Sequence, residues 1–199
     1  MRDLAIRGAG DLLGPEQSGF INSVGIDLYM QILEETLNEL RDDKKEIKKK
    51  SSMGSGVISN RYIPENYVID EGLKIEIHNK IAAIESVSDF ENLRQELIDR
   101  FGPIEEDLLV YMYEKLFYSL CNHAKVEKVD IKPKLITLTL SEEKSQTVDG
   151  MYVYNTACAL SNAFVLSYRD RKINISLKTG NMSKKSYMML LCEYLSKIV

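Results

Sequence analysis

The sequence Glu96-Leu97-Ile98-Asp99-Arg100-Phe101-Gly102-Pro103 marks the end of an amphipathic helix. Its large apolar residues continue a stripe with helical spacing, which consists of Phe90, Leu93, Leu97 and Phe101. Glycine followed by proline is a helix stop, because glycine adopts the conformation of a C-terminal cap and proline cannot continue the helical hydrogen bonds. Ser88 and Glu91 have the spacing of a capping box at the other end. The sequence therefore predicts a capped helix that ends at Gly102.

Other helices are predicted on both sides of this one. The preceding helix has the apolar positions Leu73, Ile77, Ile81 and Ile84. A longer helix follows, with Leu108, Met112, Leu116 and Leu120. A last helix, capped by Ser183, is predicted from about Lys184 to Ile198, with Tyr187, Leu191, Tyr194 and Leu195 facing inward.

Strands are predicted between the third and the last of these helices. They are Val126 to Ile131, Leu135 to Leu140, and a hairpin of Phe164 to Tyr168 and Lys172 to Leu177 around Arg169-Asp170-Arg171. Residues 147–162 are ambiguous, although Met151, Tyr154, Cys158 and Ala159 favour a helix. Helices first and strands afterwards predict an α+β domain in which a helical segment packs on a small, mostly antiparallel sheet.

Composition narrows the class of protein. The chain has 199 residues, 44% of them hydrophobic and 28% charged, which is typical of a globular protein. It contains no run of about 18 apolar residues and no signal peptide, so we expect a cytoplasmic protein with no membrane partner. A formal net charge of −4 argues against strong binding to nucleic acid by this chain alone.

The sequence shows no pattern of a catalytic or metal site. Cys121, Cys158 and Cys192 lie far apart among apolar neighbours, and we interpret them as reduced thiols in the core. His78 and His123 are isolated, and each is predicted at a helix surface or rim. We therefore expect no metal, no cofactor and no enzyme confined to these residues.

A Gly-rich loop lies near the amino terminus, at Arg7-Gly-Ala-Gly-Asp-Leu-Leu-Gly-Pro-Glu-Gln17. Its glycines, Gly8, Gly10 and Gly14, indicate tight turns or close approach of a neighbouring backbone. The spacing of a phosphate-binding P-loop, GxxxxGK[ST], does not occur in the sequence. The loop is thus either a structural connection or a segment whose arginine and glutamine exchange partners.

The sequence divides into three segments. Residues 1–41 comprise the Gly-rich loop and an amphipathic helix from about Ile21, whose apolar face makes a dimer plausible. Residues 42–56 combine a charge run, which includes Lys44 to Lys50, with glycine and serine, and we interpret them as a flexible linker. Residues 57–199 form the second domain.

Two motifs give the chain a family resemblance. The segment from Arg2-Asp3-Leu4 to Gln17 is similar to the translocation motif that follows the second motor lobe of RecG-type helicases and of bacterial transcription-repair coupling factors. Tyr62-Ile63-Pro64-Glu65-Asn66-Tyr67-Val68 and then Glu96 to Pro103 resemble the C-terminal domain of the coupling factors, which RecG-type enzymes lack. The resemblance covers nearly the whole chain, although residues 141–182 show little of the family pattern.

The resemblance implies a function for a longer parent protein. The family is an ATP-dependent double-stranded DNA translocase that pushes stalled RNA polymerase off its template and recruits nucleotide excision repair through UvrA. We therefore expect this chain to be the end of a motor lobe followed by a regulatory domain. ATP and Mg would bind in motor lobes that it lacks, so the chain alone should be inactive.

The resemblance also implies roles for individual residues. Translocation coupling would fall on Arg7 and Gln17, with Arg2 and Asp3 as weaker members and Gly8, Gly10 and Gly14 as shape residues. The C-terminal domain of the family packs against the amino-terminal module, which resembles UvrB, and hides the surface that recruits UvrA. Glu96, Asp99 and Arg100 would belong to that autoinhibitory interface.

Helical spacing alone leaves alternatives open. Glu96 and Asp99 project from one face of their helix, where they can meet arginines of a partner or pair locally with Arg100 or Arg94. An independent DNA-binding domain that grips phosphates with the loop and the Lys44 to Lys50 run is a rival function. A small enzyme with His78 or His123 beside a nucleophile is another.

Overall fold

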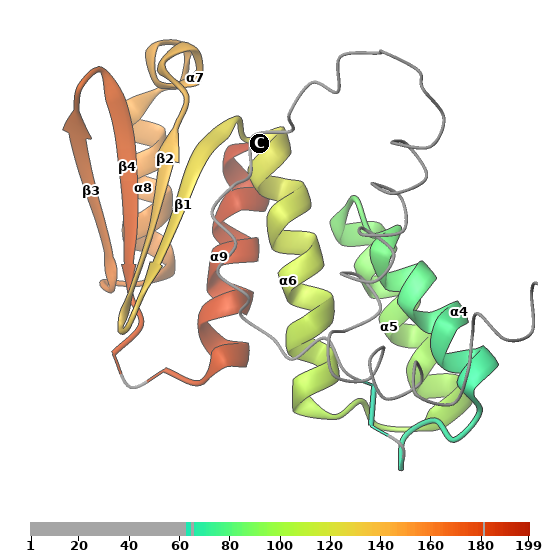
Figure 1. The fold of residues 1–199 in the computed structure, drawn as a ribbon. Coiled ribbons are helices and arrows are strands. Elements are labelled where there is room, and N and C mark those ends of the chain that lie inside the picture. Colours follow the sequence, from blue (N-terminus) through green and yellow to red (C-terminus); the bar gives the residue numbers. More distant parts are fainter. Residues whose placement is uncertain (1–62, 65, 181) are drawn as a thin grey trace, which may run out of the picture. The chain divides into compact units, whose positions relative to one another are not determined.

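The computed structural model describes residues 63–64, 66–180 and 182–199 (Figure 1). The predictions for the Gly-rich loop, the helix from Ile21 and the linker at 42–56 lie outside these residues. The division of the chain at residues 41 and 56 therefore stays a prediction.

Three helices come first among the described residues, as predicted: α4 at Glu71–Ala82, α5 at Val87–Phe101 and α6 at Glu106–His123. The predicted capping box was wrong by two residues. Ser86, not Ser88, is the N-cap of α5, and its hydroxyl accepts a hydrogen bond from the Asp89 N–H while the Asp89 carboxylate accepts one from the Ser86 N–H. The backbone of Ser86 is extended, as a cap requires, whereas Ser88 already lies in the first helical turn.

The predicted stop of α5 is confirmed. Gly102 has φ 85° and ψ −162°, and its N–H donates to the Ile98 carbonyl. The Tyr67 hydroxyl lies 3.2 Å from the Leu97 carbonyl oxygen and 3.3 Å from that of Gly102, where it can donate to either. This hydroxyl therefore provides a side-chain donor at the C-terminal end of α5, where the helix itself offers few N–H partners.

The second half of the chain forms a four-stranded antiparallel sheet. Its strands are β1 at Val126–Lys132, β2 at Leu135–Leu140, β3 at Phe164–Arg169 and β4 at Lys172–Lys178, in the order β1-β2-β4-β3. Asp170 and Arg171 form the two-residue turn of the β3–β4 hairpin with φ of 52° and 63°. The predicted sheet and its hairpin are confirmed.

Two helices connect β2 to β3, namely α7 at Glu142–Thr147 and α8 at Gly150–Leu160, and α9 at Lys184–Ile198 ends the chain. The sequence predicted α9 with its Ser183 cap and favoured α8, but it did not predict α7 as a helix. The apolar residues that α8 buries are not the four whose spacing favoured the helix. Val153 and Ala157 are buried, whereas Met151, Tyr154, Cys158 and Ala159 are exposed.

The hydrophobic core lies between the helices and one face of the sheet. That face consists of alternate strand residues, among them Ile136, Leu138, Leu140, Ile173, Ile175 and Leu177, all buried. Tyr194 of α9 packs its ring on Phe164 of β3, with centroids 4.8 Å apart, and its hydroxyl donates to the Val153 carbonyl. Helix α9 in turn packs along α6, as Figure 1 shows. The predicted α+β class is thus confirmed for the described residues.

The structure corrects two expectations about single residues. Cys121 and Cys192 are buried, as predicted, but Cys158 is exposed on the outer face of α8. His78 is buried, with its Nδ1 atom 3.2 Å from the Tyr111 hydroxyl, whereas His123 is exposed as predicted. The apolar neighbours Ile77 and Ile81 lie on the same side of α4 and bring His78 into the core.

In the described part of the chain, every helix is too short or too polar to cross a bilayer.

The backbone at Gly102 predicts a specific stability loss. Gly102→Ala should lower the free energy of unfolding by about 1–3 kcal/mol, because residues with a Cβ atom rarely adopt this conformation. Gly150→Ala is the matched control, because a Cβ at Gly150 meets no atom within 4 Å and its φ is not positive. Urea denaturation measures both. Equal stability of the two variants would contradict this assignment of strain.

Candidate functional site

A closed ring of four charged side chains joins α4 to α5. The Lys80 ammonium lies 2.9 Å from a Glu76 carboxylate oxygen and 2.6 Å from a Glu96 oxygen. The Arg100 guanidinium lies 2.7 Å from Glu96 and 3.5 Å from Glu76. Each carboxylate therefore contacts both cations, and each cation contacts one carboxylate on either helix.

The ring lies at the surface. Its side chains are 36–44% exposed, so a single pair contributes little to stability. The hydrogen bonds from Lys80 and Arg100 lower the pKa of Glu96, and the same two cations lower the pKa of Glu76. The carboxylates in turn raise the pKa of Lys80 and of Arg100. What the ring provides is orientation, because four long side chains hold one another in place on two helices.

Asp99 lies outside this ring. Its carboxylate is exposed and accepts a hydrogen bond from the Gln95 amide at 2.8 Å. Within the described ranges, Asp99 is in no ion pair, whereas Arg94 pairs with Glu91. Asp99 is therefore the carboxylate of the predicted patch with its charge left uncompensated, and Glu96 takes the local pairing with Arg100 that helical spacing had left open.

The two quoted segments of the C-terminal domain meet in space. Ile63 and Val68 are buried, and the Tyr67 ring packs on Phe101 with centroids 5.8 Å apart. The Asn66 amide donates to Glu105, which follows α5. The Arg100 guanidinium lies 5.0 Å from the centroid of the Phe101 ring. The first segment thus supports the end of the helix that presents the charged patch.

The structure brings together some predicted site residues and adds others. Glu96, Asp99 and Arg100 all lie on the last turns of α5. Arg2, Asp3, Arg7, Gly8, Gly10, Gly14 and Gln17 lie outside the described residues. Sequence reasoning missed Glu76 and Lys80, the members of the ring on α4. Their spacing of four residues is that of a helical ion pair, but no sequence signal places that pair beside Glu96.

The two buried thiols, Cys121 and Cys192, are poor nucleophiles. Burial raises the pKa of Cys121 and, with a further effect of Cys121, that of Cys192, so both remain protonated thiols at neutral pH. Within the described ranges, no three His, Cys, Asp or Glu side chains lie close enough together to hold a metal ion.

The comparisons with known proteins concern the family and the fold. Residues 58–151 match the family described as TRCF domain. The chain is 37% identical over 179 residues to the transcription-repair-coupling factor of Staphylococcus haemolyticus (strain JCSC1435). It is 34% identical over 190 residues to that of Bacillus subtilis (strain 168). The chain belongs to the transcription-repair coupling factor family.

The extent of each match limits what it shows. The alignments cover 89% and 94% of this chain but 15% and 16% of the coupling factors, so the chain spans about a sixth of these curated relatives. The fold is similar to a solved structure titled as the C-terminal domain of transcription-repair coupling factor. That match has a TM-score of 0.59 at 24% identity and covers 69% of this chain and 85% of the other.

The ring predicts how Glu96 titrates. Its carboxyl should titrate below the ordinary pKa of 4.5, and the pKa should rise when Lys80 and Arg100 are both replaced by Met. Because folding lowers this pKa, the stabilisation is present above pH 4.5 and is lost as the pH falls through the folded pKa. Carbon-13 NMR of the side-chain carboxyl measures both values. The same pKa in wild type and double variant would contradict the ring in solution.

Proposed function

We propose that residues 57–199 act as a protein-interaction and autoinhibition module of a coupling factor. Its partner would be the UvrB-like amino-terminal module of the same parent protein. The contact would use the end of α5 and keep the UvrA-recruiting surface closed. The observation that supports this best is the exposed Asp99, which has no ion pair among the described residues and lies beside the oriented ring.

The charged end of α5 suits a reversible contact. Asp99 offers a carboxylate to an arginine or lysine of a partner, and such a pair gives orientation and specificity. The ring beside it needs no rearrangement to be covered, because its two carboxylates and two cations already compensate one another. A partner that docks here therefore loses little side-chain freedom in the ring, which lowers the cost of binding.

For the parent protein we propose the activity implied by the family: ATP-dependent translocation on double-stranded DNA in the cytoplasm, displacement of stalled RNA polymerase and recruitment of excision repair. In this scheme the loop at Arg7 to Gln17 couples closure of the motor lobes to movement along DNA. An arginine and a glutamine can exchange hydrogen-bond partners between nucleotide states, which would turn closure into a step.

Binding to the amino-terminal module tests the first proposal. Asp99→Lys should weaken calorimetric binding of this chain to the separately expressed module by at least about tenfold, because it places like charges together. Glu143→Lys is the matched control, since Glu143 is an exposed carboxylate of α7 in no ion pair within the described residues. Glu96→Lys combined with Asp99→Lys should abolish binding, with folding followed by circular dichroism because the first change also breaks the ring.

Two results would reject the interface. One is equal affinity of wild type, Asp99→Lys and Glu143→Lys. The other is absence of binding both for the separate module and for the two modules joined by a flexible linker, which raises their effective concentration.

The coupling role of the loop is tested in the full-length protein. Arg7→Ala or Gln17→Ala should lower displacement of a DNA triplex by about tenfold or more while ATP hydrolysis continues, because the loop would transmit closure and bind no nucleotide. Thermal unfolding of each variant serves as the control. A parallel loss of ATP hydrolysis or of folding would contradict this role.

A further inference from the structure

Strand β3 lies at an edge of the sheet. In the strand order β1-β2-β4-β3 it has a single neighbour among the described residues, namely β4. Its first five residues, Phe164-Val-Leu-Ser-Tyr168, contain no charge and no proline. Natural edge strands commonly carry lysine, proline or a bulge, which prevent pairing with another chain. This edge has none of these features over its first five residues.

The register shows which backbone groups face outward. The Lys178 N–H donates to the Ala163 carbonyl, and Arg169 pairs with Lys172 across the two-residue turn. In an antiparallel pair, residues that exchange hydrogen bonds alternate with residues whose N–H and C=O point away. Val165 and Ser167 therefore bond to β4, whereas Leu166 and Tyr168 direct their N–H and C=O groups to the free edge.

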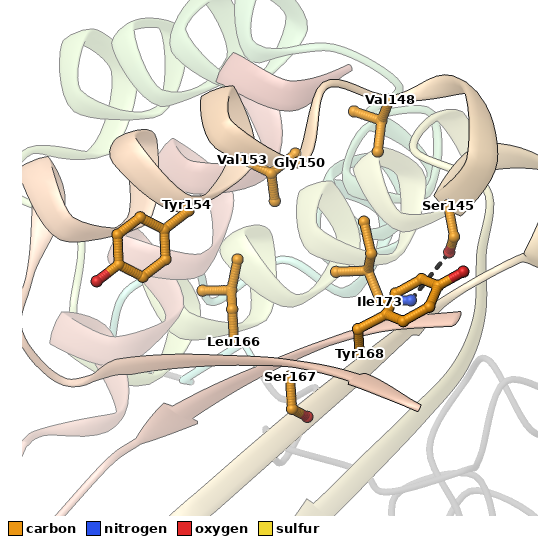
Figure 2. A pocket seen from close by; sticks show the side chains of 9 residues that line it. All are labelled: Ser145, Val148, Gly150, Val153, Tyr154, Leu166, Ser167, Tyr168 and Ile173. Atoms are coloured by element: carbon orange, nitrogen blue, oxygen red, sulfur yellow. Dashed lines mark hydrogen bonds between the residues drawn. The ribbon is translucent and has the colours of Figure 1, made fainter. Parts of the chain in front are cut away.

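A cavity lies on the same side of β3 as the side chains of these two residues. It has a volume of about 310 Å³ and lies between α8 and the β3–β4 hairpin. Its lining consists of Ser145, Val148, Gly150, Val153, Tyr154, Leu166, Ser167, Tyr168 and Ile173. Figure 2 shows the side chains of Leu166 and Tyr168 on the side of α8 and that of Ser167 directed away from it. Leu166 and Tyr168 thus contribute to the free edge and to the cavity at once.

Large apolar side chains surround the cavity without being buried. Tyr168 is 64% exposed and Tyr154 is 52% exposed. The main polar group in the lining is already occupied, because the Ser145 hydroxyl accepts a hydrogen bond from the Ile173 N–H and donates to the Ser141 carbonyl. The cavity therefore suits an apolar side chain, and the adjacent edge suits an extended backbone.

We propose that β3 binds an extended peptide segment of a partner protein as a fifth strand of the sheet, with apolar side chains at every second position facing α8 and the cavity. Backbone hydrogen bonds to Leu166 and Tyr168 would give affinity, and the cavity would select the side chain. A compact apolar ligand could fill the cavity, but it would make no hydrogen bonds to the free backbone groups of the edge. An extended strand would contact both, so the edge and the cavity together favour a strand. This surface is separate from α5 and does not depend on the function proposed above.

Selection from a library of random twelve-residue peptides displayed on phage tests the proposal on the whole chain. Enriched peptides should carry large apolar residues at alternate positions, and a synthetic peptide of the consensus sequence should bind in fluorescence anisotropy. Tyr168→Lys should weaken this binding by at least about tenfold, because it places a charge at the cavity and on the edge. Asn92→Lys, which adds the same charge at an exposed position of α5, should change it by less than about twofold.

Hydrogen exchange measured by NMR gives a second test on the wild-type chain. On peptide binding, the amide protons of Leu166 and Tyr168 should become protected, because they gain hydrogen bonds to the new strand, whereas those of Val165 and Ser167 are protected already. Failure to enrich any peptide, equal weakening by the two lysine variants, or binding without protection of these two amides would each overturn the proposal. Self-association of the chain through β3 with no peptide binding would overturn it as well.

Discussion

Helix α6 is buried on most of its sides, and the described elements depend on that burial. It contacts α4 and α5, and it also contacts α9 and β1. Ten of its eighteen residues are buried, among them Leu108, Met112, Phe117 and Cys121. An amphipathic helix buries one stripe, whereas a helix that is apolar nearly all round has to be covered by other elements. The fold can therefore be described as the set of elements that cover α6.

This constraint separates the two candidate surfaces. In Figure 1, α6 stands between the pair α4 and α5 and the pair α9 and sheet. Helices α4 and α5 pack their apolar stripes against α6 and against each other. Their charged residues therefore lie on the outside, where the side chains of Glu76, Lys80, Glu96 and Arg100 contact one another. The sheet packs one face against α8 and α9, and among the described residues its edge strand β3 pairs with β4 alone. A partner at α5 and a strand at β3 would thus act on different elements of one core.

The sequence predicted the elements well wherever one apolar stripe stood out. The bounds of α9 and β2 agree with the prediction because Leu191 and Leu195 have clear helical spacing and Ile136 and Leu138 clear alternation. In α8 two stripes compete. Val153 and Ala157 have the same spacing of four residues as Tyr154 and Cys158, and the smaller pair is buried because helix α9 lies close. Helical periodicity alone therefore does not show which of the two stripes is buried, because that depends on where the neighbouring helix packs.

The charged patch shows a similar limit for the candidate site. The motif placed Glu96, Asp99 and Arg100 on one helix. The ring of charges also includes residues of α4, where Lys80 lies sixteen residues before Glu96 in the sequence. Because Lys80 and Arg100 both bind Glu96, this carboxylate is committed within the domain, and a partner that competed for it would have to replace two charge-assisted hydrogen bonds. Asp99 has no such commitment. In this turn of the helix, Glu96 is paired within its own domain and Asp99 is exposed. Such a turn can bind and release a cationic partner while the packing of the domain stays unchanged.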